Sequence, residues 1–120
     1  MVSSSSVARA QMNFLIAVDG SPISNTAYQV VIESMLHEKD KITVAHIFNK
    51  DKGYLPFDMQ PDNLKTTYET KTLMLGTRCA LWWDEADSRL STKEHMIGLA
   101  KKAGADLLVV GMHGRKGPKV

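Results

Sequence analysis

The chain has 120 residues, of which 43% are hydrophobic and 23% are charged, and its formal net charge at pH 7 is +2. This length allows a single domain with a buried core that needs no metal or disulfide to hold it together. The small charge gives no sign of a nucleic-acid surface, and the apolar runs fall far short of the ~20 residues that span a bilayer. We therefore expect neither a membrane-embedded nor a nucleic-acid-binding protein.

The N-terminal segment, residues 1–11, holds four consecutive serines and no periodic apolar pattern, which predicts a disordered leader. Residues 12–120 are expected to form one domain. The single cysteine, Cys79, cannot form an internal disulfide, and the N-terminus shows no secretory apolar segment. Both features favour a cytoplasmic setting, in which Cys79 is a structural thiol.

The first predicted strand, residues 14–18, is a short apolar run that ends at Asp19. Ser21 followed by Pro22 predicts the cap and the first residue of a helix, which should end near residues 39–41. Apolar residues recur in it every three or four positions and predict a stripe that faces the sheet. This stripe comprises Ile23, Ala27, Val30, Val31 and Met35.

A second strand is predicted at residues 42–48, followed by a glycine- and proline-containing loop that is long enough to be a lid or an irregular crossover. Asp62 or Asn63 can cap a second helix that reaches about residue 75. A third strand, residues 78–83, includes two adjacent tryptophans, which must face opposite sides of the sheet.

Ser91 predicts the cap of the last helix, and Gly104 predicts its end. The inner side of this helix should carry Met96, Ile97, Leu99, Ala100 and Ala103. The fourth strand, Leu107–Val110, follows at once. Its fully apolar sequence is typical of a strand that is buried on both faces.

Four strands that alternate with three helices predict an α/β fold, a doubly wound, Rossmann-like parallel sheet with helices on both faces. Ligands of such sheets bind beyond the carboxyl ends of the strands, where the strand order reverses. The first strand delivers Asp19 to that edge, the second delivers Ile47 and Phe48, and the fourth delivers residues 111–114. These features converge on one site.

The loop after the fourth strand is rich in glycine and basic residues. Gly111 and Gly114 allow a sharp turn and a close approach of the backbone to a ligand. The cations that follow, Arg115, Lys116 and Lys119, would favour an anion, although they can equally form a solvated end. The loop predicts a phosphate or nucleotide site but lacks the Gly-Lys-Ser/Thr ending of a P-loop.

From about residue 12 to residue 119 the chain resembles the universal stress protein family. The matching elements are Asp19-Gly20-Ser21, the pair His46-Ile47, and residues 104–115. In ATP-binding members the last loop reads glycine, two residues, glycine, nine residues, then glycine and serine or threonine. Gly111 and Gly114 match the first half, and the second half would lie beyond residue 120. The resemblance thus implies a C-terminally truncated domain of four strands, with the fifth strand missing and the nucleotide site incomplete.

The resemblance also implies the site residues. Asp19, Ala17 and Ile47 would hold the nucleoside, and four loop residues would border the ribose and the first phosphates: Gly111, Met112, His113 and Gly114. The implied ligand is ATP or another adenine nucleotide, with Mg²⁺ arriving only with the nucleotide. The family's homodimer is in doubt, because in many relatives the fifth strand forms its interface.

No nucleophile elbow and no cluster of metal ligands is visible, so we do not expect an enzyme. The leading hypothesis is a stress-response nucleotide-binding module with a regulatory role. The alternative is a scaffold of the same fold that binds no nucleotide and acts through unknown protein partners. A phosphoryl-accepting receiver domain, using Asp19 and Asp84, is a third possibility.

Several candidate residues also have purely structural interpretations. Asp19 can satisfy turn amides, His46 can be a core histidine, and His113 can cap a strand end. His37 and His95 are expected on helices facing solvent, and no histidine pair has the spacing of a zinc site.

Overall fold

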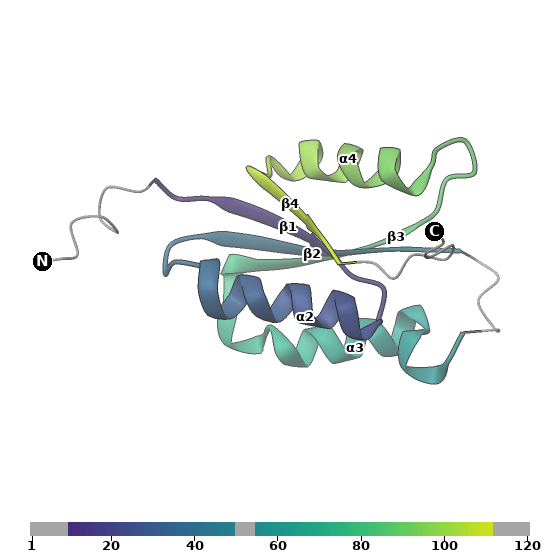
Figure 1. Ribbon diagram of the computed structural model, residues 1–120, viewed down its shortest axis with the longest axis horizontal. Coiled ribbons are helices and arrows are strands. Elements are labelled where there is room, and N and C mark those ends of the chain that lie inside the picture. Colours follow the sequence, from purple (N-terminus) through teal and green to yellow (C-terminus); the bar gives the residue numbers. More distant parts are fainter. Residues whose placement is uncertain (1–9, 50–54, 112–120) are drawn as a thin grey trace, which may run out of the picture.

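The computed structural model describes residues 10–49 and 55–111 and contains a four-stranded, fully parallel sheet (Figure 1). Its strands are β1 (Asn13–Ala17), β2 (Lys41–Phe48), β3 (Cys79–Glu85) and β4 (Leu107–Val110). The spatial order is β3-β2-β1-β4. The chain therefore moves outward from β1 to β3 and then returns to the other side of β1, which places the reversal of strand order between β1 and β4.

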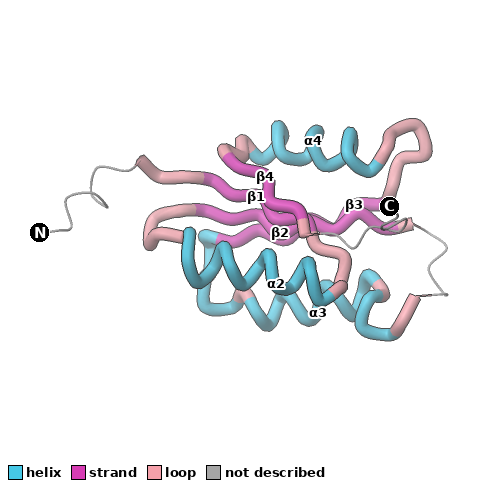
Figure 2. Tube along the Cα trace, viewed as in Figure 1, coloured by secondary structure: helices cyan, strands magenta, loops and turns pink. Residues whose placement is uncertain are grey.

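Helices cover both faces of the sheet, as the sequence predicts. The helices α2 (Pro22–Val30) and α3 (Pro61–Lys71) lie side by side on one face, and α4 (Thr92–Ala103) lies on the other (Figures 1 and 2). The α/β, doubly wound fold class is thus confirmed. Within the described ranges, no helix combines the length and apolar character needed to cross a membrane.

Two hydrophobic clusters fill the space between the sheet and its helices. Alternation along β1 sends Phe14 and Ile16 to the side of α2 and α3 and Leu15 to the side of α4. The α2–α3 side is completed by Val18, Tyr28, Val31, Ile42, Val44, Leu64 and Tyr68. The α4 side is smaller, with Ala45 and Leu99 as its other fully buried members. The larger core therefore lies under α2 and α3.

The predicted apolar stripe of the first helix is confirmed at Val31, which is 1% exposed, and is wrong at Ile23, Val30 and Met35. The residues of α2 that are buried are Ser24 and Tyr28, whereas Ile23 is 52% exposed and Val30 is 48% exposed. The buried face of α2 begins at Ser24, one position later than the predicted stripe, and the apolar pattern misses this position because serine is polar. Ser24 is fully buried, and its hydroxyl accepts a hydrogen bond from the backbone N–H of Asp19 at 3.2 Å.

The end of this helix also differs from the prediction. After Val30 the chain forms a π-helix, Val31–Met35, in which the N–H of Leu36 donates to the carbonyl of Val31 at 2.8 Å. The wider turn shifts Met35 out of the predicted stripe. The helix does not reach residues 39–41, and Asp40 is instead buried, with its carboxylate accepting from the N–H groups of Met12 and His37.

The caps of the other helices are partly as predicted. Gln60 occupies the cap position of α3 and makes no capping side-chain bond, so Asp62 and Asn63 are not the caps. Ser91 does cap α4, in a capping box with Glu94, and the helix ends at Gly104. The inner side of α4 is also as predicted, with the exception of Ile97, which is 39% exposed.

The pairing of β4 with β1 joins segments that are far apart in sequence. Asn13 donates from its backbone N–H to the Asp106 carboxylate at 2.8 Å, and its carbonyl accepts from the N–H of Asp106 at 2.7 Å. Leu107 and Val110 remain 36% and 47% exposed, so the expectation that β4 is buried on both faces is wrong for the described part of the protein.

Candidate functional site

The strand register brings the predicted site residues to one edge of the sheet. Ala17 is aligned with Ala45 of β2 and with Val110 of β4. Asp19, Ile47 and Gly111 therefore all lie just beyond this level, at the carboxyl ends of three adjacent strands. The remaining predicted residues, Met112, His113 and Gly114, lie outside the described residues, as do the cations of the same loop.

A hydrogen-bonded turn fixes Asp19 after β1. Its Oδ1 accepts from the backbone N–H of Ser21 at 2.9 Å, and the Ser21 hydroxyl accepts from the N–H of Ser24 at 3.2 Å, capping α2. Gly20 adopts φ +85°, which a residue with a side chain rarely tolerates. The turn thus holds the carboxylate of Asp19 beside the first turn of α2.

A close approach to Met59 also favours glycine at position 20. A Cβ at this position would lie 2.9 Å from Cγ of Met59, in the 3₁₀ helix Phe57–Met59. A groove of about 560 Å³ opens here between α2 and α3, and its lining includes Gly20, Tyr68 and Lys71. Neither Asp19, Ile47 nor Gly111 lines this groove, so it adjoins the predicted site without being part of it.

Gly111 is required by the packing of α2. A Cβ at Gly111 would lie 2.7 Å from Cβ of Ala27 and 2.8 Å from the carbonyl oxygen of Ile23. Its φ is not positive, so backbone freedom is not what selects glycine here. The small residue lets the chain leave β4 directly against α2, and any ligand contact at this position would come from its backbone.

Ala17 and Ile47 belong to the packed sheet at this edge. Ala17 is 3% exposed and is paired with strands on both sides, so its side chain belongs to the core. Ile47 packs against the α4-side cluster. The carbonyl of Phe48, one residue further along β2, accepts from the N–H of Ala86 at 2.7 Å.

His46 is buried beneath the Asp19 turn. Its side chain follows Ile42 and Val44 on the α2–α3 side and contacts the rings of Phe48 and Trp83. Nδ1 is 2.8 Å from the carbonyl oxygen of Val18, so Nδ1 carries the proton. Nε2 is buried and has no hydrogen-bond partner among the described residues. Burial lowers the pKa of His46 from its usual value of 6.5, although the Val18 bond and the charge of Asp19 oppose this.

We expect His46 to make the fold sensitive to acid. Because its pKa is lower in the folded than in the unfolded chain, the unfolded chain binds more protons, and the free energy of unfolding falls as pH drops below about 6.5. Urea unfolding between pH 7.5 and pH 4.5 measures this effect. The variant His46→Asn should show a shallower pH dependence in this range, and identical slopes would contradict the prediction.

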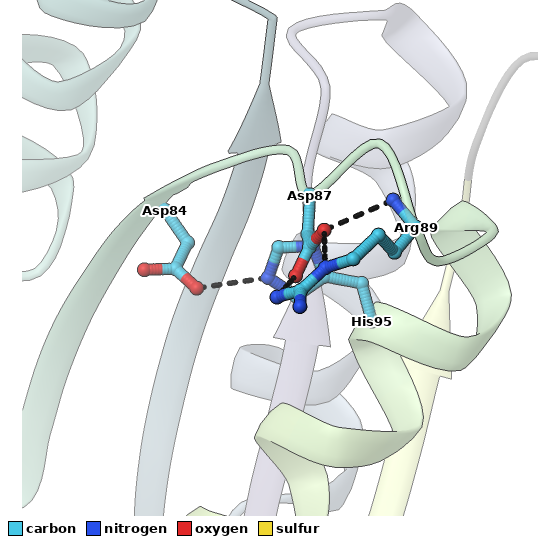
Figure 3. A network of polar contacts seen from close by, with 4 residues as sticks. All are labelled: Asp84, Asp87, Arg89 and His95. Atoms are coloured by element: carbon cyan, nitrogen blue, oxygen red, sulfur yellow. Dashed lines mark hydrogen bonds and ion pairs between the residues drawn. The ribbon is translucent and has the colours of Figure 1, made fainter.

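His95 is not the solvent-facing residue that the sequence predicts. Its side chain is 11% exposed, and Nε2 lies 2.8 Å from Oδ2 of Asp84 at the end of β3 (Figure 3). A sequence signal exists: His95 precedes the buried Leu99 by four residues, which places both on one side of a helix. The pair connects α4 to the carboxyl edge of β3. The other histidine, His37, is exposed as predicted, although it follows the helix.

An ion pair between Arg89 and Asp87 lies on the loop between β3 and α4. Two hydrogen bonds from the Arg89 guanidinium, together with the Arg89 backbone N–H, lower the pKa of the partly exposed Asp87 carboxyl to about 2 (Figure 3). In residues 10–49 and 55–111, no three His, Cys, Asp or Glu side chains gather as a metal site. Asp19 and Asp84, the two residues of the receiver-domain alternative, belong to no such group among the described residues.

Comparisons with known proteins give the same fold. The chain matches no protein-family model and no curated protein sequence. Among solved structures it is similar to a universal stress protein family member from Burkholderia pseudomallei, with a TM-score of 0.63 and 18% identity over 85% of this chain and 82% of the other. It is also similar to the universal stress protein UspA from Lactobacillus plantarum, with a TM-score of 0.63 and 19% identity over 92% and 84% of the two chains.

A third similar structure is a universal stress protein in complex with cAMP, with a TM-score of 0.51 and 18% identity over 83% of this chain and 75% of the other. The described domain therefore has the universal stress protein fold, as the resemblance implied.

Proposed function

We propose that this chain binds adenine nucleotides, ATP foremost, at the carboxyl edge of β1, β2 and β4, and that it acts as a regulatory module of the stress response. The observation that carries the proposal is the placement of Asp19 and Gly111 on either side of the reversal of strand order. Ligands of doubly wound sheets bind at this point. The similar structure that contains cAMP supports an adenine nucleotide as the ligand class.

In the proposed complex, the Asp19 carboxylate accepts hydrogen bonds from the nucleoside, and backbone groups after β2 and β4 line the remainder of the site. Mg²⁺ would enter only with the phosphates of the nucleotide. We infer binding without turnover, because the described edge presents a carboxylate and backbone groups but no activated nucleophile. The cytoplasm, suggested by the single thiol of Cys79, is the proposed location.

One observation favours the alternative, a scaffold that binds no nucleotide. The small size of Gly111 is explained by its contacts with Ile23 and Ala27, so this glycine does not by itself require a ligand. A protein could keep the fold and this glycine while acting only through protein partners.

Equilibrium titration of the full chain distinguishes the two functions. ATP, ADP, AMP and cAMP would be added with and without Mg²⁺, with GTP as the base control, and the heat of binding measured. We expect saturable binding of adenine nucleotides, weaker binding of GTP and no release of phosphate from ATP. Absence of saturable binding would favour the scaffold, and steady ATP hydrolysis would overturn the regulatory function.

A further inference from the structure

The outer edge of β3 has no partner strand among the described residues. β2 pairs with β3 along its length, from Cys79 to Glu85, and the described sheet ends there. An edge strand presents backbone N–H and C=O groups that can pair with another strand. The paired side of β3 adjoins β2, which carries Ile47 of the proposed nucleotide site, and the unpaired outer edge of β3 faces away from that site.

A groove of about 400 Å³ follows this edge. Its lining residues belong to β3 and to the helices α3 and α4. Because α3 and α4 lie on opposite sides of the sheet (Figure 2), the groove extends over β3 from one face to the other. Trp82 packs against the α4-side cluster and Trp83 against the α2–α3 side. The Nε1 of Trp83 donates to the carbonyl of Pro61 at 2.8 Å, which fixes this indole.

The charge of the groove is positive on both sides of the strand. Lys65 of α3 and Lys102 of α4 are exposed and line it from opposite faces. One carboxylate, that of Asp84, is among the lining residues, and it is hydrogen-bonded to His95 at 2.8 Å. An occupant of this groove would therefore meet two ammonium groups, one on each face.

We propose that the β3 edge groove binds an extended acidic segment of a partner protein, which pairs with β3 as an additional strand. Successive side chains of a strand point to opposite faces, so acidic residues of such a segment reach Lys65 on one face and Lys102 on the other. Backbone hydrogen bonds supply affinity for an extended segment of any sequence, and the two lysines supply the preference for acidic side chains. A second copy of this chain is a poor occupant, because it would bring its own lysines to the same groove.

Peptide binding to the full chain tests the proposal. The probe is a fluorescein-labelled peptide in which pairs of adjacent glutamates are separated by pairs of threonines, so that both faces of the strand carry carboxylates, and it matches the 7 residues of β3. A second peptide has lysine in place of glutamate, and a third has the acidic sequence with N-methyl groups on alternate backbone nitrogens. We expect binding of the first, and losses of roughly tenfold or more with the other two, because one reverses the charge and the other blocks one hydrogen-bonding edge.

Two double variants with the same change in net charge locate the site. K65E/K102E should weaken binding of the acidic peptide by roughly tenfold, since each substitution replaces an attraction with a repulsion. K71E/K101E changes exposed lysines on the same two helices outside this groove and should bind like the wild type. Circular dichroism checks that both variants are folded.

Three results would overturn the proposal: no binding of the acidic peptide at millimolar concentration, equal binding of the N-methylated peptide, or equal losses in the two double variants. A concentration-dependent dimer that K65E/K102E changes and K71E/K101E does not would assign the groove to a second copy instead. Amide chemical shifts that move along β3 when the acidic peptide binds would support the strand pairing.

Discussion

Replacing Gly111 with valine should destabilise the protein by about 3 kcal/mol, the upper part of the range for adding atoms to a close-packed region. The new Cβ would lie 2.7 Å from Cβ of Ala27 and 2.8 Å from the backbone oxygen of Ile23. Neither atom is the end of a flexible side chain, so α2 or the end of β4 must move. Urea unfolding, followed by circular dichroism, measures the loss.

A matched pair of alanine substitutions isolates the cause. Gly111→Ala adds a single carbon at the crowded position and should destabilise the protein, whereas Gly98→Ala adds the same carbon on α4, where no atom lies within 4 Å. In the interior of a helix, alanine is favoured over glycine by roughly 0.5–1 kcal/mol, so Gly98→Ala should stabilise the protein. Effects of the same sign would show that the contact with α2 is not the reason for Gly111.

Replacing Asp19 with alanine should weaken the binding of adenine nucleotides by roughly 5- to 150-fold. The nucleoside groups that donate hydrogen bonds to the carboxylate would be left without an acceptor, and an unpaired donor typically costs about 1–3 kcal/mol. The variant also loses the hydrogen bond from the Ser21 N–H at 2.9 Å, and with it the orientation of the turn. Calorimetric titration with ATP, under the conditions used for the wild type, gives the change in affinity.

Two controls separate binding from folding in this experiment. Asp19→Asn keeps an oxygen that can accept from Ser21, so it should preserve the turn while removing the charge. Asp62→Ala removes an exposed carboxylate from the first turn of α3 and should leave the affinity unchanged. An unaltered dissociation constant in Asp19→Ala would show that Asp19 only stabilises the turn and does not bind the nucleotide.

Local signals in the sequence predict the fold well where one residue type decides the geometry. Ser21 with Pro22 begins α2, and Ser91 with Gly104 delimits α4, because hydrogen-bonding caps and a C-terminal glycine act within a few residues. The four strands are likewise found from their short apolar runs. The edge at which Asp19, Ile47 and Gly111 meet then follows from the parallel topology.

What the sequence does not predict depends on contacts between distant segments. Ser24 looks like a surface residue until the backbone of Asp19 supplies its partner, and His95 looks solvated until Asp84 does so. Polarity alone assigns such residues to the outside, whereas a hydrogen bond offsets the cost of burying them. The role of Gly111 is similar, because only the packed position of α2 shows why a side chain is excluded there.

The link between Asn13 and Asp106 has a consequence for the order of events during synthesis. The two residues are 93 positions apart, whereas the residues that join β1 to β2 are separated by only 28. A chain that is made from its N-terminus can therefore pair β1, β2 and β3 while β4 has not yet been translated. Closing the long loop costs additional chain entropy, and only the contacts that β4 makes when it pairs with β1 offset this cost. The proposed nucleotide site, which needs both β1 and β4, cannot exist on the growing chain before that step, so ligand binding would be a property of the finished fold alone.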